Sequence, residues 1–222
     1  MAAPVRAVVF DFDGLVLDTE VPIYRSWCEV FEEHGCAPPT LEEWARELGT
    51  QRGLDVVGLL AERAGRPVEE QAVQASRRAR RDELLAREPA RPGVVQWLDD
   101  AARLGFGTAI ASSSEEEWVH RHLTRLGLRH RFAHLSCWGE RLAPKPAPDT
   151  YLAACKCLGV APEQALAVED SPNGIAAARA AGLRVVAVPN DLTAKLDLSA
   201  ADVVIGSLAG HHVTEIIATI GG

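Results

Sequence analysis

The sequence predicts an α/β protein with a doubly wound parallel sheet, the layered class in which helices cover both faces of the sheet. Three observations indicate this class. Short apolar runs without polar alternation recur along the chain, as is typical of strands covered on both faces. Helical patterns alternate with these runs, and polar clusters follow several of them. Open sheets of this class bind ligands at the carboxyl ends of their strands, so the polar clusters are candidate functional residues.

The first strand is expected at 5–10, and the alternation of helix and strand continues after residue 92. Further strands are expected at 107–111, 165–168, 184–188 and 202–205, with an additional candidate at 132–136. Helices are expected near 93–104, 115–126, 148–158, 172–181 and 208–219. This order predicts a sheet whose strands are joined by helical crossovers.

Residues 19–88 contain helical patterns and no convincing strand. Amphipathic spacing predicts helices at 24–31, 41–48, 54–64 and 68–87. The sequence therefore predicts an α/β core formed by 1–18 and 89–222, with 19–88 as a helical insertion after the first strand.

Two helix starts bear on the candidate site. Ser114 and the three glutamates after it have the spacing of a capping box, which places Ser112 and Ser113 just ahead of a helix. The free N–H groups at such a position can bind an anion. Ser171 is expected to cap the next helix, and Gly182 is expected to follow its last turn.

Composition limits the classes of partner. The chain has 222 residues, 47% of them hydrophobic, and a formal net charge of −8, which disfavours nucleic acid and anionic membranes as partners. No apolar stretch approaches the roughly 18 residues of a membrane span. The five cysteines lack the spacing of a zinc site and are expected to be reduced thiols. We therefore expect a cytoplasmic protein, with a monomer as the default.

Complementary polar groups follow the expected strands. They are Asp11 and Asp13 after the first strand, Ser112, Ser113 and Ser114 after the second, and Glu169 and Asp170 after 165–168. A proline-rich loop between the last two clusters carries Lys145, one of three lysines in the chain. Together these segments supply carboxylates, hydroxyls and a cation.

These segments, in this order, resemble the four motifs of the haloacid dehalogenase superfamily of phosphohydrolases, in particular its branch with a helical cap after the first strand. The matching segments are Asp11-Phe-Asp13-Gly14 with the 18–20 continuation, Ser112 after Ile110 and Ala111, Lys145, and 168–174 followed by a helix of small residues. The resemblance spans nearly the whole chain. It implies that 19–88 is the cap.

The resemblance implies a phosphatase that uses Mg²⁺. Asp11 would be the nucleophile that forms an aspartyl-phosphate, a known form of covalent catalysis by a carboxylate. Asp11, Asp170 and the backbone carbonyl of Asp13, with Glu169 adjacent, would form the oxygen-rich site that Mg²⁺ prefers. Lys145 would supply a second cation against the charge of the phosphate.

The remaining groups would act on the phosphoryl group and the leaving group. Ser112 and the N–H groups near Ser113 would hold the phosphoryl oxygens. Asp13 would protonate the departing alkoxide and then activate water as general acid and base. The expected substrate is a small phosphorylated metabolite such as a sugar phosphate, although the sequence does not identify it.

Alternative reactions stay open to different degrees. An acid at Asp13 disfavours dehalogenation, and the absence of lysine from 19–88 disfavours cleavage of phosphonates by a cap lysine. A phosphomutase related to β-phosphoglucomutase is the main alternative, because the loop from Gly49 to Arg52 resembles the cap loop that holds substrate in that enzyme. The mutase pattern has a histidine at the position of Ile23, and the absence of that histidine here favours hydrolysis. A module that binds phosphate compounds without turnover is the non-enzymatic alternative.

Overall fold

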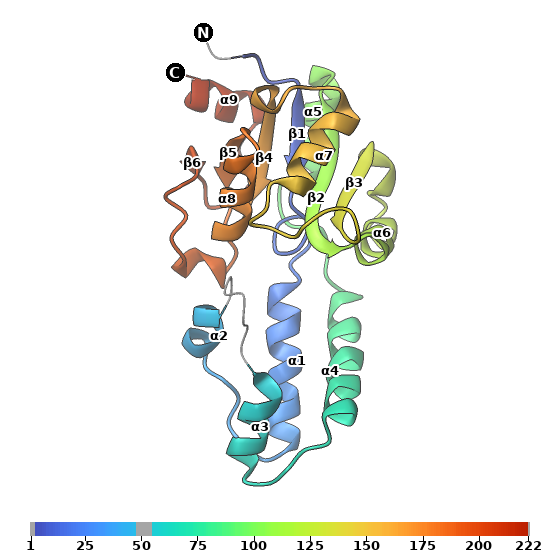
Figure 1. Cartoon of the computed structure of the whole chain (residues 1–222), viewed down its shortest axis with the longest axis vertical. Coiled ribbons are helices and arrows are strands. Elements are labelled where there is room, and N and C mark those ends of the chain that lie inside the picture. Colours follow the sequence, from blue (N-terminus) through green and yellow to red (C-terminus); the bar gives the residue numbers. More distant parts are fainter. Residues whose placement is uncertain (1–2, 48–54, 222) are drawn as a thin grey trace. The chain divides into compact units, whose positions relative to one another are not determined.

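A computed structural model describes residues 3–47 and 55–221 of the chain, which divides into two compact units (Figure 1). The first unit comprises Met1–Leu17, Pro89–Asn190 and Leu196–Gly222, and the second comprises Asp18–Glu88 and Asp191–Lys195. The expected insertion lies in the second unit. That unit also includes Asp191–Lys195, which contains a short 3-10 helix at Thr193–Lys195 and which the sequence predicts as part of the core.

The first unit is built on a parallel six-stranded sheet with the order β3-β2-β1-β4-β5-β6 (Figure 1). The strands are β1 (Ala7–Phe10), β2 (Gly107–Glu115), β3 (His134–Trp138), β4 (Ala165–Glu169), β5 (Arg184–Ala187) and β6 (Val203–Val204). The predicted fold class and all six strands are confirmed. Phe10, the last residue of β1, pairs with Ile110 on β2 and with Val168 on β4, so β1 lies between these two strands. β4 ends one residue beyond this pair, at Glu169, whereas β2 continues to Glu115.

Helices cover both faces of this sheet. They are α5 (Val94–Leu104), α6 (Glu116–Arg125), α7 (Asp149–Leu158), α8 (Pro172–Ala180) and α9 (Val213–Gly221). Residues of α7 and α8, among them Tyr151 and Ile175, pack with Val9 and Ala167 in one buried cluster. Because side chains alternate along a strand, Phe10 points to the opposite face, where its ring meets Phe132 edge-on at 5.8 Å.

Local hydrogen bonds explain where two of these helices begin. The hydroxyl of Ser171 accepts a hydrogen bond from the N–H of Gly174, as expected of the cap of α8. The prediction that the last helix begins at residue 208 is wrong, because α9 begins at Val213. Gly210 has a φ of 82°, which is not a helical conformation, and the N–H of His212 is capped by the side chain of Glu215.

The chain leaves the first unit and returns to it at neighbouring points. Leu17 forms an antiparallel bridge with Ala90, and the N–H of Arg91 donates to the carbonyl of Val16 at 3.0 Å. The segment that leaves the first unit and the segment that returns to it are therefore hydrogen-bonded to each other at the two ends of the insertion.

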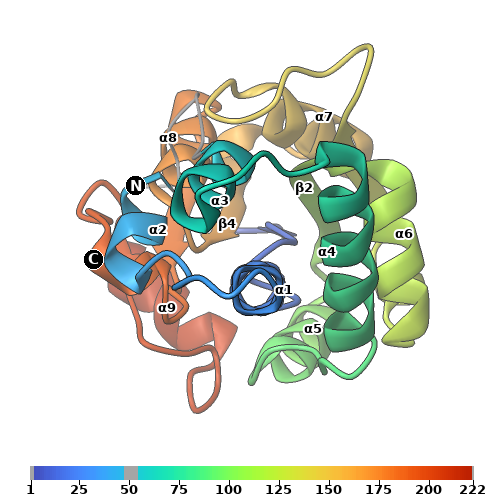
Figure 2. The same cartoon turned by 90° about the horizontal axis from the view of Figure 1, so that it is seen from below.

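In the described part of the second unit the regular elements are helices, as predicted for the insertion. They are α1 (Glu20–Glu33), α2 (Leu41–Glu47), α3 (Val56–Ala64) and α4 (Glu70–Leu85), and α1 and α4 lie side by side (Figures 1 and 2). Trp27, Phe31 and Leu60 form the centre of its buried cluster, which also includes Leu192. Leu192 therefore explains why Asp191–Lys195 groups with this unit.

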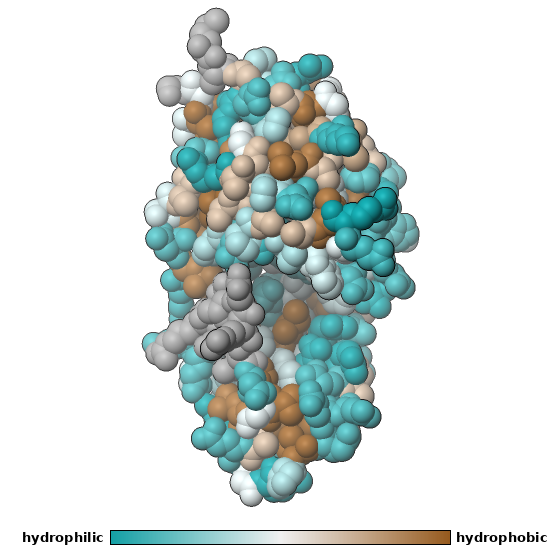
Figure 3. Space-filling view, viewed as in Figure 1, coloured by the Kyte–Doolittle hydropathy of each residue, from teal (hydrophilic) through white to brown (hydrophobic). Residues whose placement is uncertain are grey.

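The surface shows mixed polarity. On the face of the first unit drawn in Figure 3, hydrophobic residues are scattered among hydrophilic ones. Across residues 3–47 and 55–221, none of the helices has both the length and the apolar character that crossing a membrane requires.

Candidate active site

Three acidic side chains meet where β1 and β4 end. Asp11 directly follows β1, Glu169 is the last residue of β4, and Asp170 follows it. Each offers a carboxylate oxygen that lies within 4.8 Å of the other two, and all three are buried. We call these three residues the acidic cluster. The strand order reverses between β1 and β4, and such a switch point is where open α/β sheets form ligand sites.

A buried lysine enters the acidic cluster from the loop before α7. The ammonium group of Lys145 donates to Oδ1 of Asp11 and, at 2.5 Å, to Oε1 of Glu169. Its side chain is only 6% exposed. Lys145 therefore pairs with two members of the acidic cluster, whose three carboxylates outnumber this one ammonium group.

The pKa values of the two ion-pair partners reflect this balance. Burial raises the pKa of Asp11 to about 8, and the charge of Glu169 adds to the rise, although Lys145 acts against it. Burial works against the charge of Lys145, but Asp11 and Glu169 outweigh it and raise the pKa of the ammonium group above its ordinary value. Lys145 is therefore a permanent cation, whereas Asp11 needs further positive charge to stay ionised near neutral pH.

Hydrogen-bond donors surround Glu169 on both carboxylate oxygens. Besides Lys145, Oε1 accepts from the hydroxyl of Tyr151 at 2.7 Å. Oε2 accepts from the N–H groups of Asp170 and Ser171 and from the hydroxyl of Ser171. A Cβ at Gly174 would collide with this carboxylate. Glu169 is thus fixed in place, and burial together with its charge raises the pKa of Tyr151 well above the ordinary value.

Asp170 is held by residues that the sequence analysis did not select. Nδ2 of Asn190 donates to Oδ2 of Asp170 at 2.8 Å and to the carbonyl of Gly14 at 3.4 Å. Arg91 also donates to that carbonyl, at 2.5 Å. Gly14 has a φ of 82° and no room for a Cβ, which would collide with the Asp170 carboxylate. Asn190 lies just beyond the carboxyl end of β5, so the rule that selected the other clusters could have found it.

The side chain of Asp13 faces β2 and α6. Its Oδ2 accepts hydrogen bonds from the hydroxyls of Ser114 at 2.7 Å and Ser112 at 3.4 Å, and its Oδ1 accepts from the indole N–H of Trp118 at 2.9 Å. The sequence predicts Ser114 as a helix cap beside the site and does not predict Trp118 as a site residue. Trp118 follows the ordinary spacing of an amphipathic helix, so no sequence signal marks it.

The expected capping box at Ser114 is wrong. β2 continues to Glu115, which pairs with Trp138 on β3, and α6 begins only at Glu116 without a side-chain cap. The Ser114 hydroxyl is free of the helix terminus and donates to Asp13 instead, while its N–H donates to the hydroxyl of Ser112 at 2.9 Å. Strand pairing with β3 therefore overrides the local helix-start pattern.

The other predicted site residues lie in three different settings. Ser112 is 1% exposed and lies beside Asp13. The hydroxyl of Ser113 accepts a hydrogen bond from the backbone N–H of Lys145 at 3.1 Å, which ties the end of β2 to the lysine loop. Gly49 and Arg52 lie outside the described residues. Ile23, which bears on the mutase alternative, belongs to α1 in the second unit.

The acidic cluster fits a hard divalent cation. Carboxylate oxygens are the ligands that Mg²⁺ prefers. Both carboxylate oxygens of Glu169 accept hydrogen bonds from protein donors, one of them Lys145. Asn190 holds the carboxylate of Asp170 in place beside Asp11. Asp11 and Asp170 are therefore the members of the acidic cluster best placed to bind an ion. Burial raises the pKa of Asp11, and a cation bound beside this carboxylate would favour its ionised form.

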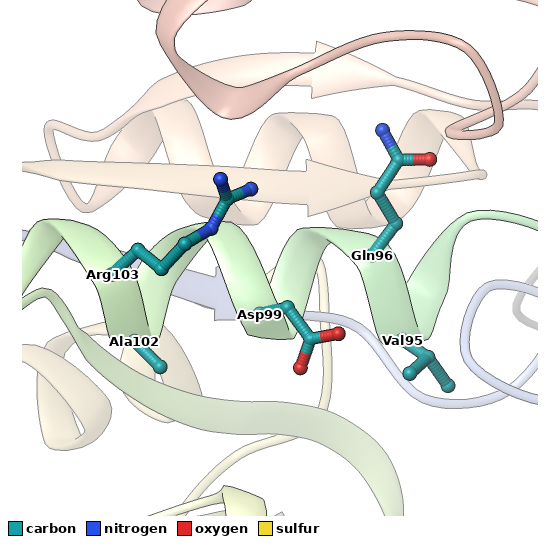
Figure 4. A pocket seen from close by; sticks show the side chains of 5 residues that line it. All are labelled: Val95, Gln96, Asp99, Ala102 and Arg103. Atoms are coloured by element: carbon teal, nitrogen blue, oxygen red, sulfur yellow. The ribbon is translucent and has the colours of Figure 1, made fainter.

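A separate hollow lies along the outer side of α5 and shares no residue with the acidic cluster. It has a volume of about 790 Å³ and is lined by Val95, Gln96, Asp99, Ala102 and Arg103, which lie on successive turns of the helix (Figure 4). It is open and carries no cluster of groups suited to catalysis.

Comparison with known proteins gives a consistent result. A family model described as haloacid dehalogenase-like hydrolase matches residues 5–182. The protein named "Putative phosphatase YhcW" of Bacillus subtilis is 41% identical over 192 residues, which are 86% of this chain and 87% of that protein. The protein named "Probable pseudouridine-5'-phosphatase" of Drosophila melanogaster is 32% identical over 214 residues, 90% of this chain and 89% of that protein.

Solved structures show the same likeness. The crystal structure of CbbY from Rhodobacter sphaeroides in complex with phosphate is 28% identical, with a TM-score of 0.75 over 98% of this chain and all of that one. A second crystal structure, of a CbbY variant with xylulose-(1,5)bisphosphate, is 27% identical, with a TM-score of 0.74 over 95% of this chain and 98% of that one. The resemblance therefore extends through both units of the chain.

Proposed function

The chain belongs to the haloacid dehalogenase-like hydrolase family, and we propose that it is a Mg²⁺-dependent phosphatase that acts on a small phosphorylated metabolite through an aspartyl-phosphate on Asp11. Its relatives include proteins named as phosphatases, and the chain is a phosphatase of this family. The cofactor, the covalent intermediate and the substrate class are the parts that we propose.

One observation carries the proposal: Asp11, Lys145, Glu169 and Asp170 converge at the switch point of the sheet. A carboxylate nucleophile that approaches a phosphate dianion at ~4 Å meets about 4 kcal/mol of repulsion per charge pair at an effective dielectric constant of 20. Lys145 brings one positive charge directly to Asp11. Asp11, Asp170 and the backbone carbonyl of Asp13 would hold a divalent ion, which would supply the remaining positive charge and polarise the phosphoryl oxygens.

In the first half-reaction, a carboxylate oxygen of Asp11 forms a bond to phosphorus while the bond from phosphorus to the ester oxygen breaks. The departing alkoxide takes a proton from Asp13. The Ser112 hydroxyl, together with backbone N–H groups near Ser113, would hold the oxygens of the transferring group in line for attack.

In the second half-reaction, Asp13 takes a proton from water, and the water oxygen attacks phosphorus. The bond between phosphorus and Asp11 breaks, phosphate leaves, and the Asp11 carboxylate is restored. Lys145 stabilises that carboxylate as it forms again. Asp13 thus returns to its protonated form and is ready for the next ester.

Phosphorylated sugars are the substrate class that we favour. The CbbY variant with xylulose-(1,5)bisphosphate and the pseudouridine-5'-phosphatase name indicate small phosphorylated compounds for two relatives. Gly49 and Arg52 remain proposed contacts for the end of the substrate far from phosphorus. A cytoplasmic location and a monomeric state remain predictions.

A metabolite panel with and without Mg²⁺ tests the proposal. We expect Mg²⁺-dependent release of phosphate from one or more sugar phosphates, loss of that release in Asp11→Asn, and normal release in the control Asp99→Asn, which changes an exposed aspartate of α5. Release of phosphate by Asp11→Asn at the native rate would exclude the covalent intermediate. With β-glucose 1-phosphate and a bisphosphate activator, a phosphomutase would form an isomer instead of free phosphate.

A further inference from the structure

Asp13 is held from two sides by groups of different chemistry. The indole N–H of Trp118 donates to Oδ1 at 2.9 Å, and the hydroxyl of Ser114 donates to Oδ2 at 2.7 Å. Trp118 lies in the first turn of α6, whereas Ser114 lies near the end of β2. The two oxygens of one carboxylate are therefore fixed by two separate elements.

The two donors differ in what they permit. An indole N–H can only donate, so an oxygen that faces it must be an acceptor. A serine hydroxyl can donate or accept after rotation about its C–O bond. A carboxyl proton on Oδ1 would therefore confront the N–H of Trp118, whereas a proton on Oδ2 could be accommodated by Ser114 and by Ser112, whose hydroxyl lies 3.4 Å away.

We propose that Trp118 and Ser114 are positioning residues that orient Asp13, so that Oδ2 is the oxygen that exchanges protons with the leaving group and with water. This inference rests on the acid and base role of Asp13 in the proposed function. Oδ2 lies beside Ser112, the hydroxyl proposed to hold the phosphoryl group. Trp118 thereby directs the reactive oxygen toward the place where the leaving group departs.

The ring of Trp118 is itself held firmly enough for this task. The guanidinium group of Arg121 lies over the indole ring, 5.1 Å from its centroid, and the ring of the buried His122 meets it edge-on at 4.4 Å. His122 in turn packs against Phe12, the residue between Asp11 and Asp13. The ring that orients Asp13 is thus connected by packing to the same loop through His122.

Trp118→Phe removes the N–H and keeps most of the ring packing, and two esters distinguish positioning from general damage. An alkyl phosphate has a poor leaving group that needs a proton, whereas p-nitrophenyl phosphate releases a stable anion without one. For an alkyl ester that the native enzyme hydrolyses, we expect kcat/KM to fall roughly 10- to 100-fold, as for a misplaced catalytic group. For the nitrophenyl ester we expect kcat/KM to change by less than about threefold. Ser114→Ala should give a smaller selective loss, because Trp118 still holds Oδ1 of Asp13.

Trp138→Phe is the matched control, because Trp138 is an exposed tryptophan on β3, and both esters should be hydrolysed normally. Equal losses on both esters for Trp118→Phe, or no loss on either, would overturn the inference. Asp13→Asn separates it from the function: if that variant keeps alkyl ester hydrolysis, the acid role of Asp13 is wrong. If Asp13→Asn is inactive on the alkyl ester while Trp118→Phe is normal, only the positioning role fails.

Discussion

The ammonium nitrogen of Lys145 lies 2.5 Å from Oε1 of Glu169, a carboxylate that is completely buried. The same nitrogen donates to Asp11. Glu169 accepts from so many protein donors that it has little freedom to move. It therefore anchors the lysine, and the lysine in turn is aimed at the carboxylate proposed as nucleophile.

Glu169→Gln should destabilise the protein and lower activity. The amide that replaces one oxygen would turn two of its own N–H bonds toward donors such as Lys145 and Tyr151, and Lys145 would lose a buried partner. Breaking one side of a buried ion pair costs about 3–5 kcal/mol. Urea unfolding measures this loss, with the exposed Glu163→Gln as the control. Equal unfolding midpoints for both variants would show that Glu169 is not the anchor.

Gly174→Ala should also destabilise the protein, through a steric clash with Glu169. A Cβ at Gly174 would overlap the carboxylate of Glu169, although the glycine's own backbone is not in the left-handed region. Displacing a packed group of this kind costs about 1–3 kcal/mol. We expect a lower melting temperature and a lower kcat, because Lys145 moves with its anchor. Gly139→Ala, where a Cβ meets no atom within 4 Å, should melt like the native protein.

The stability of the metal-free protein should fall as pH rises from about 4 to about 8. The pKa of Asp11 is raised from 3.8 to about 8 by burial and by Glu169, so the folded state binds more protons than the unfolded state in this range. Raising the pH removes that proton and with it the stabilisation. Melting temperatures measured in a chelator across this range test the sign.

Two further measurements separate Asp11 from other titrating groups. Asp11→Asn carries no charge at this position, so its melting temperature should depend less on pH than that of the native protein. Mg²⁺ should restore stability most at the upper end of the range, where the ionised carboxylate needs a cation. A native protein whose metal-free stability rises between pH 5 and 8 would contradict the assignment.

Asp100 should matter for stability and not for catalysis. Its buried carboxylate accepts from Nδ1 of His212 at 2.9 Å and from the N–H of Val213 at 3.2 Å, where α9 begins. Burial alone would raise the pKa of Asp100, but these donors outweigh it and hold the pKa below its usual value. Asp100→Asn should therefore lower the unfolding free energy by about 1–3 kcal/mol and leave kcat unchanged. A large loss of kcat in the folded variant would contradict this division.

Strand positions and the acidic groups beyond them could be predicted from the sequence, because both depend on local patterns. An apolar run buried on both faces predicts a strand, and the carboxyl ends of parallel strands meet at one edge of a sheet. Asp11, Glu169 and Asp170 followed from these two rules. The start of α9 did not, because it depends on the backbone of Gly210 and on the side chain of Glu215.

The partners of Asp13 could not be predicted for a different reason. Ser114 carries a strong local helix-start pattern, yet pairing between β2 and β3 extends the strand past it. Trp118 reaches Asp13 from more than 100 residues away along the chain. Such contacts depend on how the helices and strands pack, and no periodic pattern in a single sequence predicts that packing.

The bridge between Leu17 and Ala90 also bears on how proteins of this design can diversify. Residues of the first unit hold the two ends of the insertion next to each other. A segment of another length or sequence could therefore replace the insertion without displacing β1, the strand that leads to Asp11. Exchanging that segment would then alter the second unit, while the proposed catalytic groups remain where the sheet fixes them.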